Sequence, residues 1–147
     1  CPRSNRITVT GRDAPIREYL EEGNLLAVGT DSLSSSPSLD VLDDAAMIYD
    51  LAREQGYTRD DLTHRIIRMI TIGGAEEMGM HVGAGRIGQI NAGATAFFDI
   101  PVGIDSPYAI ERTLEDFVRH GAGTNRATII SGNVVHNDGI FDIRQER

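Results

Sequence analysis

Asp31 is the residue whose type and position most directly suggest chemistry. It follows a short apolar run, residues 24–30, which is bounded by Gly23 on one side and by a serine-rich stretch on the other. Such a run predicts a strand that is buried on both faces, with Asp31 at its carboxyl end. In a (β/α) barrel, catalytic groups lie at that end of the strands. A turn or a helix cap is the alternative role, because short polar residues after strands commonly take it.

Other candidate motifs give weaker indications of a functional site. Residues 83–88 spell the G-x-G-x-x-G of a dinucleotide-binding loop, but a helical pattern precedes them and Gly93 follows closely, so turn glycines are the favoured interpretation. Cys1 has no neighbouring base that would make it a nucleophile. The four histidines lack the spacing of a zinc site on one helix or strand; they are His64, His81, His120 and His136.

Composition narrows the class of protein. The chain has 147 residues with 40% hydrophobic content, which is enough for one core of ordinary size. A net charge of −8 argues against binding to nucleic-acid backbones, which requires a basic surface. All 14 basic residues are arginines, which excludes a phosphate-loop or Schiff-base lysine within these residues. One cysteine and the lack of a long apolar stretch lead us to expect a cytoplasmic protein without a membrane partner.

Apolar periodicity predicts several helices. The expected segments are residues 14–22, residues 36–56 with Ser36 and Pro37 at the start, residues 62–70 after a capping pair at Thr58 and Asp61, a restart at 75–80, and residues 107–120. The acidic residues of the second helix predict a solvated face, with one of them suited to the helix dipole at the start; they are Asp40, Asp43, Asp44 and Asp50.

Short β-like runs follow in the second half, at residues 86–90, 95–100 and 126–135. The last run is expected to continue through a hairpin turn at residues 137–139 into 140–141. The run at 24–30 has no comparable strand near it. A single strand needs a partner, so we expect its neighbours to lie outside these residues.

Taken together, five groups of residues resemble the C-terminal portion of the metal-dependent amidohydrolase superfamily, and most of all its cytosine deaminase and chlorohydrolase-like branch. The matching groups occur in the order of the family across nearly the whole chain: Cys1–Asn5, Gly29–Ser32 with Ser36–Asp40, Thr71–Ala75, Gly85–Gly88, and Gly93. One departure is Ala96-Phe97, where the family usually has an Ala-Asp pair.

The resemblance implies an α/β fold composed of the last part of a (β/α)8 TIM barrel and part of a small β-sandwich. Residues 1–84 would form the end of the barrel, with residues 1–5 after the seventh strand and residues 24–30 as the eighth. Residues 85–147 would belong to a sandwich that segments from both chain ends build jointly.

The resemblance also implies the chemistry of a hydrolase that removes an amino or similar group from a nitrogen heterocycle. Asp31 would contact a catalytic divalent metal, zinc first and iron second, and would carry protons from the attacking water to the leaving group. Ser4, Asn5 and Ser32 would border the same pocket as candidate substrate-binding residues.

Family members carry further metal-binding histidines on earlier strands, and these residues lack them. We therefore expect the chain to be inactive without an upstream part of the barrel. When complete, the protein is expected to form a homo-oligomer. The alternative is a small α/β module that binds a partner through exposed strand edges and has no catalytic activity.

Overall fold

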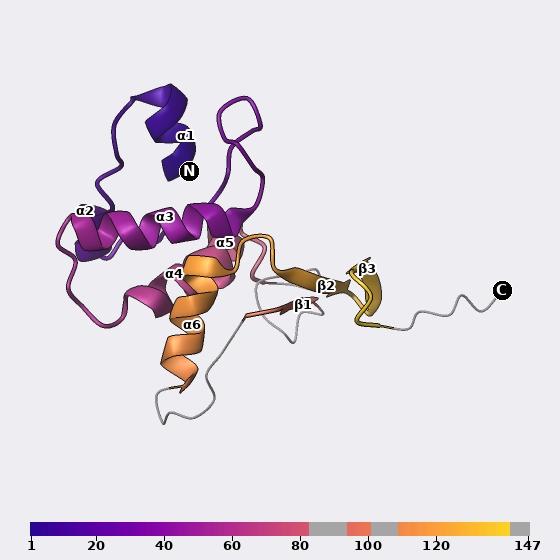
Figure 1. Cartoon of the computed structure of the whole chain (residues 1–147). Helices are drawn as coiled ribbons and strands as arrows, with labels where there is room; N and C mark the ends of the chain where they lie inside the picture. The colour runs from indigo at the N-terminus through magenta and orange to yellow at the C-terminus, as the bar shows by residue number, and fades with distance from the viewer. Residues whose placement is uncertain (83–93, 101–108, 142–147) are drawn as a thin grey trace.

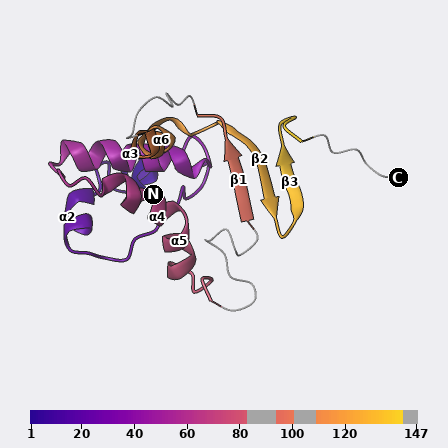
Figure 2. The same cartoon turned by 90° about the horizontal axis from the view of Figure 1, so that it is seen from below.

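A computed structural model describes residues 1–82, 94–100 and 109–141 of the chain (Figure 1). Its helical elements are Pro2–Ser4 (α1), a π-helical turn at Asn5–Val9 (η1), Ile16–Glu21 (α2), Val41–Glu54 (α3), Leu62–Ile70 (α4), Ile72–Glu77 (α5) and Ala109–His120 (α6). The strands Ala94–Phe98 (β1), Asn125–Ile130 (β2) and Asn133–Asn137 (β3) pair as an antiparallel sheet in the order β1-β2-β3. The sheet lies to one side of the helices, with β3 outermost (Figure 2).

Helix α3 organises the core, because α1, α2, α4 and α6 all pack against it. Apolar residues recur along α3 at helical spacing and are buried: Leu42, Ala45, Ile48, Tyr49, Leu51 and Ala52. They meet the buried side chains of Leu20, Leu62, Ile66 and Val118 from the surrounding helices. Each fully buried Leu, Ile or Val contributes roughly 1.5–3 kcal/mol relative to an exposed one. Within the described part of the chain, none of the helices is long and apolar enough to cross a membrane.

The predicted helices at 14–22 and 62–70 are confirmed as α2 and α4, and the helix predicted at 107–120 is confirmed over its described residues as α6. The helix predicted from Ser36 and Pro37 starts later. Its N-cap is Asp40, whose carboxylate accepts a hydrogen bond from the Leu42 amide at 2.9 Å. The backbone carbonyl of Ser38 is occupied by the guanidinium of Arg3 at 3.2 Å, and Asp40 itself is extended. The residues before α3 are therefore held outside the helix.

The run at 126–135 is two strands rather than one, which corrects the predicted hairpin position. Ile130 pairs with Asn133, so the turn consists of Ser131 and Gly132. Both turn residues have positive φ, +51° and +79°, which matches the twist that a two-residue hairpin turn requires. Strand β1 agrees with the prediction at 95–100, whereas the β-like run at 86–90 and the glycine motif at 83–88 lie outside the described residues.

The predicted strand at residues 24–30 is wrong for the described structure, because this segment pairs with no strand among the described residues. Instead it lies along α4, where the Val28 amide donates to the carbonyl of Met69 at 3.3 Å. Leu26 and Val28 pack on the core as partly buried residues. The parallel pairing of a barrel is thus not observed among these residues, and the division at 84/85 remains a prediction.

Gly73 allows this close approach. A Cβ at Gly73 would lie 2.7 Å from the carbonyl oxygen of Leu26 and 2.8 Å from that of Arg68, closer than real Cβ contacts. At the next residue, Gly74, a Cβ would meet the Met69 carbonyl oxygen at an ordinary 3.7 Å. The two neighbouring glycines of α5 therefore differ in the space around them, and Gly73 is the one that allows the Leu26 backbone to lie so close to the start of α5.

We predict that Gly73→Ala lowers the free energy of unfolding by about 1–3 kcal/mol, because backbone atoms must move to accommodate the methyl group. Gly74→Ala is the matched control and should leave the protein as stable or up to about 1 kcal/mol more stable, since alanine favours helix over glycine. Urea unfolding of both variants measures the difference. Equal stabilities would contradict the close approach.

Candidate functional site

Asp31 lies on the rim of a cavity of about 430 Å³ between the N-terminal segment and the helices α2, α3 and α4. Most of the wall is apolar, with polar groups from Ser4, Asn5 and Asp31 on one side. The apolar side chains of the lining are Val9, Ile16, Tyr19, Leu26, Ile48 and Met69. A carboxylate beside an apolar cavity with few polar groups is typical of a small-molecule site.

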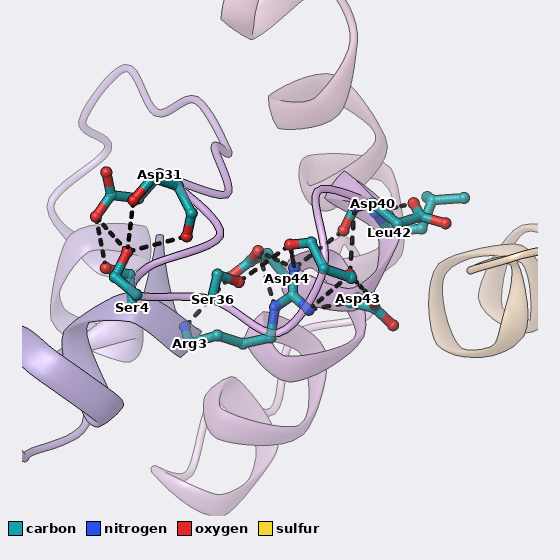
Figure 3. A network of polar contacts seen from close by, with 11 residues as sticks. Arg3, Ser4, Asp31, Ser36, Asp40, Leu42, Asp43 and Asp44 are labelled. Atoms are coloured by element: carbon teal, nitrogen blue, oxygen red, sulfur yellow. Dashed lines mark hydrogen bonds and ion pairs between the residues drawn. The ribbon is translucent and has the colours of Figure 1, made fainter.

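Two serine hydroxyls hold the carboxylate of Asp31, and Figure 3 shows the contact with Ser4. Ser4 donates to Oδ2 at 2.8 Å, and Ser35 donates to the same oxygen at 2.7 Å. The backbone of Asp31 has a φ of 62°, in the left-handed region that aspartate tolerates better than most residues. None of the described residues donates a hydrogen bond to Oδ1. One oxygen of the carboxylate is therefore fixed by the protein, and the other is available.

The same two hydrogen bonds lower the pKa of Asp31, with Ser35 as the larger cause and Ser4 as the second. Hydrogen bonds to the charged form of a carboxyl group favour that form. Asp31 is therefore ionised at neutral pH. An ionised carboxylate with one free oxygen can bind a cation or accept a proton from a neighbouring water.

Arg3 fixes the helix turn that carries Ser4. Its backbone amide donates to Oδ1 of Asp44 at 3.2 Å, and its Nε and Nη2 donate to Oδ2 at 3.0 and 2.8 Å. Asp44 is completely buried, and the Arg3 side chain is 11% exposed. Removing a charge from water costs several kcal/mol unless it is paired and hydrogen-bonded, and here the pairing is nearly complete. The ion pair therefore locks α1 against α3.

The remaining guanidinium donors of Arg3 bind the segment that leads into α3. Nη1 donates to the Ser38 hydroxyl and to Oδ2 of Asp43, both at 3.0 Å, and Nη2 reaches the Asp40 carbonyl at 3.1 Å. The Ser38 hydroxyl also donates to Asp43. The prediction that the acidic residues of this helix form a solvated face is thus wrong for Asp44 and holds for Asp50, which is exposed.

The structure brings three of the four predicted site residues to one cavity. Ser4, Asn5 and Asp31 line it, whereas Ser32 is exposed and its hydroxyl bonds that of Ser34 at 2.7 Å. The Asn5 amide donates to the carbonyl of Arg12 at 2.8 Å. Sequence reasoning missed Ser35, although its place four residues after Asp31 in a serine-rich stretch is the kind of signal that could have indicated a local hydroxyl contact.

A complete metal site requires more than these residues offer. A catalytic zinc takes three protein ligands, and the described residues contain no group of three candidate ligands. His64, His81, His120 and His136 are all exposed and lie on separate segments. The free Oδ1 of Asp31 suits one ligand position, since carboxylate oxygen binds Zn²⁺ and other divalent metals. The described part of the chain thus fits one ligand of a metal and not a whole site.

Comparisons with known proteins agree on one family. The model of the amidohydrolase family matches residues 1–135. A 5-methylthioadenosine/S-adenosylhomocysteine deaminase of Natronomonas pharaonis is 33% identical over the whole chain, which aligns to 32% of that protein. Proteins with the same name from Haloarcula marismortui and Halobacterium salinarum are 31% and 35% identical over 100% and 94% of the chain, and over 33% and 31% of their own lengths.

The chain therefore spans about a third of the length of these curated relatives. No solved structure matches it significantly.

We predict that Asp44→Ala lowers the free energy of unfolding by about 3–5 kcal/mol, because it leaves the charge of Arg3 buried without its partner. Asp50→Ala on the exposed face of the same helix is the control and should change stability by no more than about 0.5 kcal/mol. Chemical denaturation followed by circular dichroism compares the two variants. A loss no larger for Asp44→Ala than for Asp50→Ala would show that the ion pair does not hold α1.

We also predict that Ser35→Ala raises the pKa of Asp31 toward the ordinary aspartate value of about 3.9. The lowered pKa stabilises the folded state above that value, and this contribution is lost as the pH falls through the folded pKa. Titration of the Asp31 carboxyl carbon by NMR reports the shift directly. Ser34→Ala removes a nearby hydroxyl that does not touch Asp31, so it should leave the titration unchanged. The same pKa in both variants would contradict the assignment.

Proposed function

Because this chain belongs to the amidohydrolase family, we propose that it forms part of a deaminase in which Asp31 handles the proton of the attacking water. The supporting observation is the carboxylate itself, which lies on a cavity wall with Oδ2 held by two hydroxyls and Oδ1 left open. The family match over residues 1–135 favours this enzymatic role over a non-catalytic binding module.

The proposed reaction is the hydrolysis of a carbon–nitrogen bond in an aromatic heterocycle. The oxygen of water adds to the ring carbon that carries the amino group, Asp31 takes the proton of that water, and the same carboxyl group returns it to the departing nitrogen. The carbon–nitrogen bond breaks and ammonia leaves. One carboxylate can perform both transfers in sequence, provided that it is ionised at the start, as the lowered pKa of Asp31 indicates.

A bound divalent metal would supply the activation of water, because coordination lowers the pKa of water toward neutrality. Asp31 would occupy one ligand position through one lone pair of Oδ1, and the second lone pair of the same oxygen would take the proton. The remaining metal ligands would come from outside the described residues. We propose zinc or iron as the metal. Under this proposal, the other ligands would lie on barrel strands outside the described residues, and pairing with those strands would convert residues 24–30 into a strand.

The substrate is proposed from the names of the relatives. They are named for deamination of 5-methylthioadenosine and S-adenosylhomocysteine, so an adenine base with a substituted ribose is the first substrate class to test. The cavity is mainly apolar in its lining, which suits a ligand with a large uncharged part. Asn5 would border such a ligand on the polar side of the cavity. Ser32 is the weaker candidate, since its hydroxyl faces Ser34.

We predict that Asp31→Asn in the metal-loaded protein that contains these residues lowers kcat at least about 100-fold, in the range that general acid–base groups contribute. Asparagine has the same shape and can still accept from Ser4 and Ser35, so the thermal unfolding midpoint should change little. Release of ammonia from 5-methylthioadenosine and from S-adenosylhomocysteine is the assay.

Asp50→Asn, an exposed aspartate on α3, is the control for a change of charge elsewhere and should keep the rate of the parent protein. The proposed function fails if Asp31→Asn turns over both substrates within twofold of that control.

A further inference from the structure

We propose that Ser4 and Ser35 are positioning residues for Asp31, which together fix Oδ2 and thereby leave Oδ1 as the oxygen that takes part in the reaction. This inference rests on the proposed function, because both serines would act only through Asp31. It assigns Ser4 a contact different from the substrate contact expected from the sequence. It also gives a role to Ser35, which no sequence pattern had singled out.

The hydroxyls of Ser4 and Ser35 converge on one oxygen of Asp31. Ser4 lies 27 residues before Asp31 on α1, and Ser35 lies four residues after it in the loop, yet both donate to the same oxygen. A single hydrogen bond would leave the carboxylate free to rotate about its terminal torsion. Two donors that approach from separate segments restrict that rotation. They also leave the second oxygen without a donor among the described residues.

Each serine hydroxyl can donate only one hydrogen bond at a time. A serine has one proton to donate, and both serines direct theirs at Asp31. The other contacts of the Ser35 hydroxyl are with the carbonyl of Ser32 at 3.2 Å and the Ser32 hydroxyl at 3.4 Å, and both are longer than the 2.7 Å to Asp31. While these bonds last, neither hydroxyl can donate to a substrate. Ser4 and Ser35 therefore act on the carboxylate and not on the ligand.

Both serines are buried, whereas the carboxylate that they hold is exposed. Ser4 is 1% and Ser35 8% exposed, whereas Asp31 is exposed at the rim of the cavity. Buried hydroxyls are hydrogen-bonded in stable structures, so the two donors cannot simply turn toward water when Asp31 moves. Ser4 is held further by its neighbour Arg3, whose backbone and side chain are tied to buried Asp44. The reactive group is thus exposed while its supports belong to the interior.

The test compares four variants of the metal-loaded protein that contains these residues. Ser4→Ala and Ser35→Ala should each lower kcat about 10–100-fold, the range typical for loss of a group that orients a metal ligand, with KM within twofold of the parent value. Ser35→Thr keeps a hydroxyl and should recover most of the lost rate. Ser34→Ala removes a hydroxyl that bonds Ser32 and not Asp31, and it should behave as the parent protein does.

A readout independent of turnover is zinc affinity, measured by competition with a chelator at fixed pH. Ser35→Ala should weaken zinc binding about tenfold relative to Ser34→Ala, because the free oxygen of Asp31 is then no longer oriented. Thermal unfolding of every variant shows that the fold is kept.

The outcomes separate this inference from the proposed function. If Asp31→Asn is inactive but Ser4→Ala and Ser35→Ala keep both kcat and zinc affinity within twofold of Ser34→Ala, the serines do not position Asp31 and the proposed function stands. A rise in KM of more than twofold in Ser4→Ala and Ser35→Ala that Ser35→Thr does not reverse would also overturn the positioning role. If Asp31→Asn keeps full activity, the proposed function fails and this inference fails with it.

Discussion

The buried ion pair between Arg3 and Asp44 is the interaction on which the arrangement of the site depends. Asp44 is completely buried on α3, so its charge is tolerated only because Arg3 reaches it with the guanidinium and the backbone amide. A pair of this kind gains little over an apolar pair, but it tolerates only one geometry. Arg3 also binds the segment before α3. One side chain therefore sets the position of α1 and the start of α3 at the same time.

The position of the Asp31 carboxylate depends on these contacts. Ser4 follows Arg3 on the same turn, so the ion pair that fixes α1 also fixes the hydroxyl that Asp31 accepts. On the other side, residues 24–30 reach Asp31 along α4 and the start of α5, where Gly73 leaves room for the Leu26 carbonyl. The site thus depends on polar contacts between segments that are far apart in sequence, while the apolar core around α3 keeps those segments in place.

The sequence predicted the elements whose residues repeat at a regular spacing, because that spacing can be recognised within a short segment. The helices α4 and α6 follow from apolar residues at helical spacing, and Asp31 was singled out by the apolar run before it. The start of α3 was missed because Ser36-Pro37 has the form of a helix start, whereas the carbonyl of Ser38 is taken by an arginine 35 residues away. The burial of Asp44 was missed for the same reason, since its partner is 41 residues away. The spacing of apolar residues in a sequence gives no information about a polar contact between two residues so far apart.

In the proposed reaction, Asp31 acts through Oδ1 while Ser4 and Ser35 hold Oδ2. The most direct measurement is a crystal structure of the zinc-loaded protein that contains these residues, with the metal located by anomalous scattering. We expect Oδ1 of Asp31 to lie within coordination distance of the zinc, with both serine hydroxyls still bonded to Oδ2. A zinc ion bound away from Asp31, or bound through Oδ2 with the serines displaced, would contradict it.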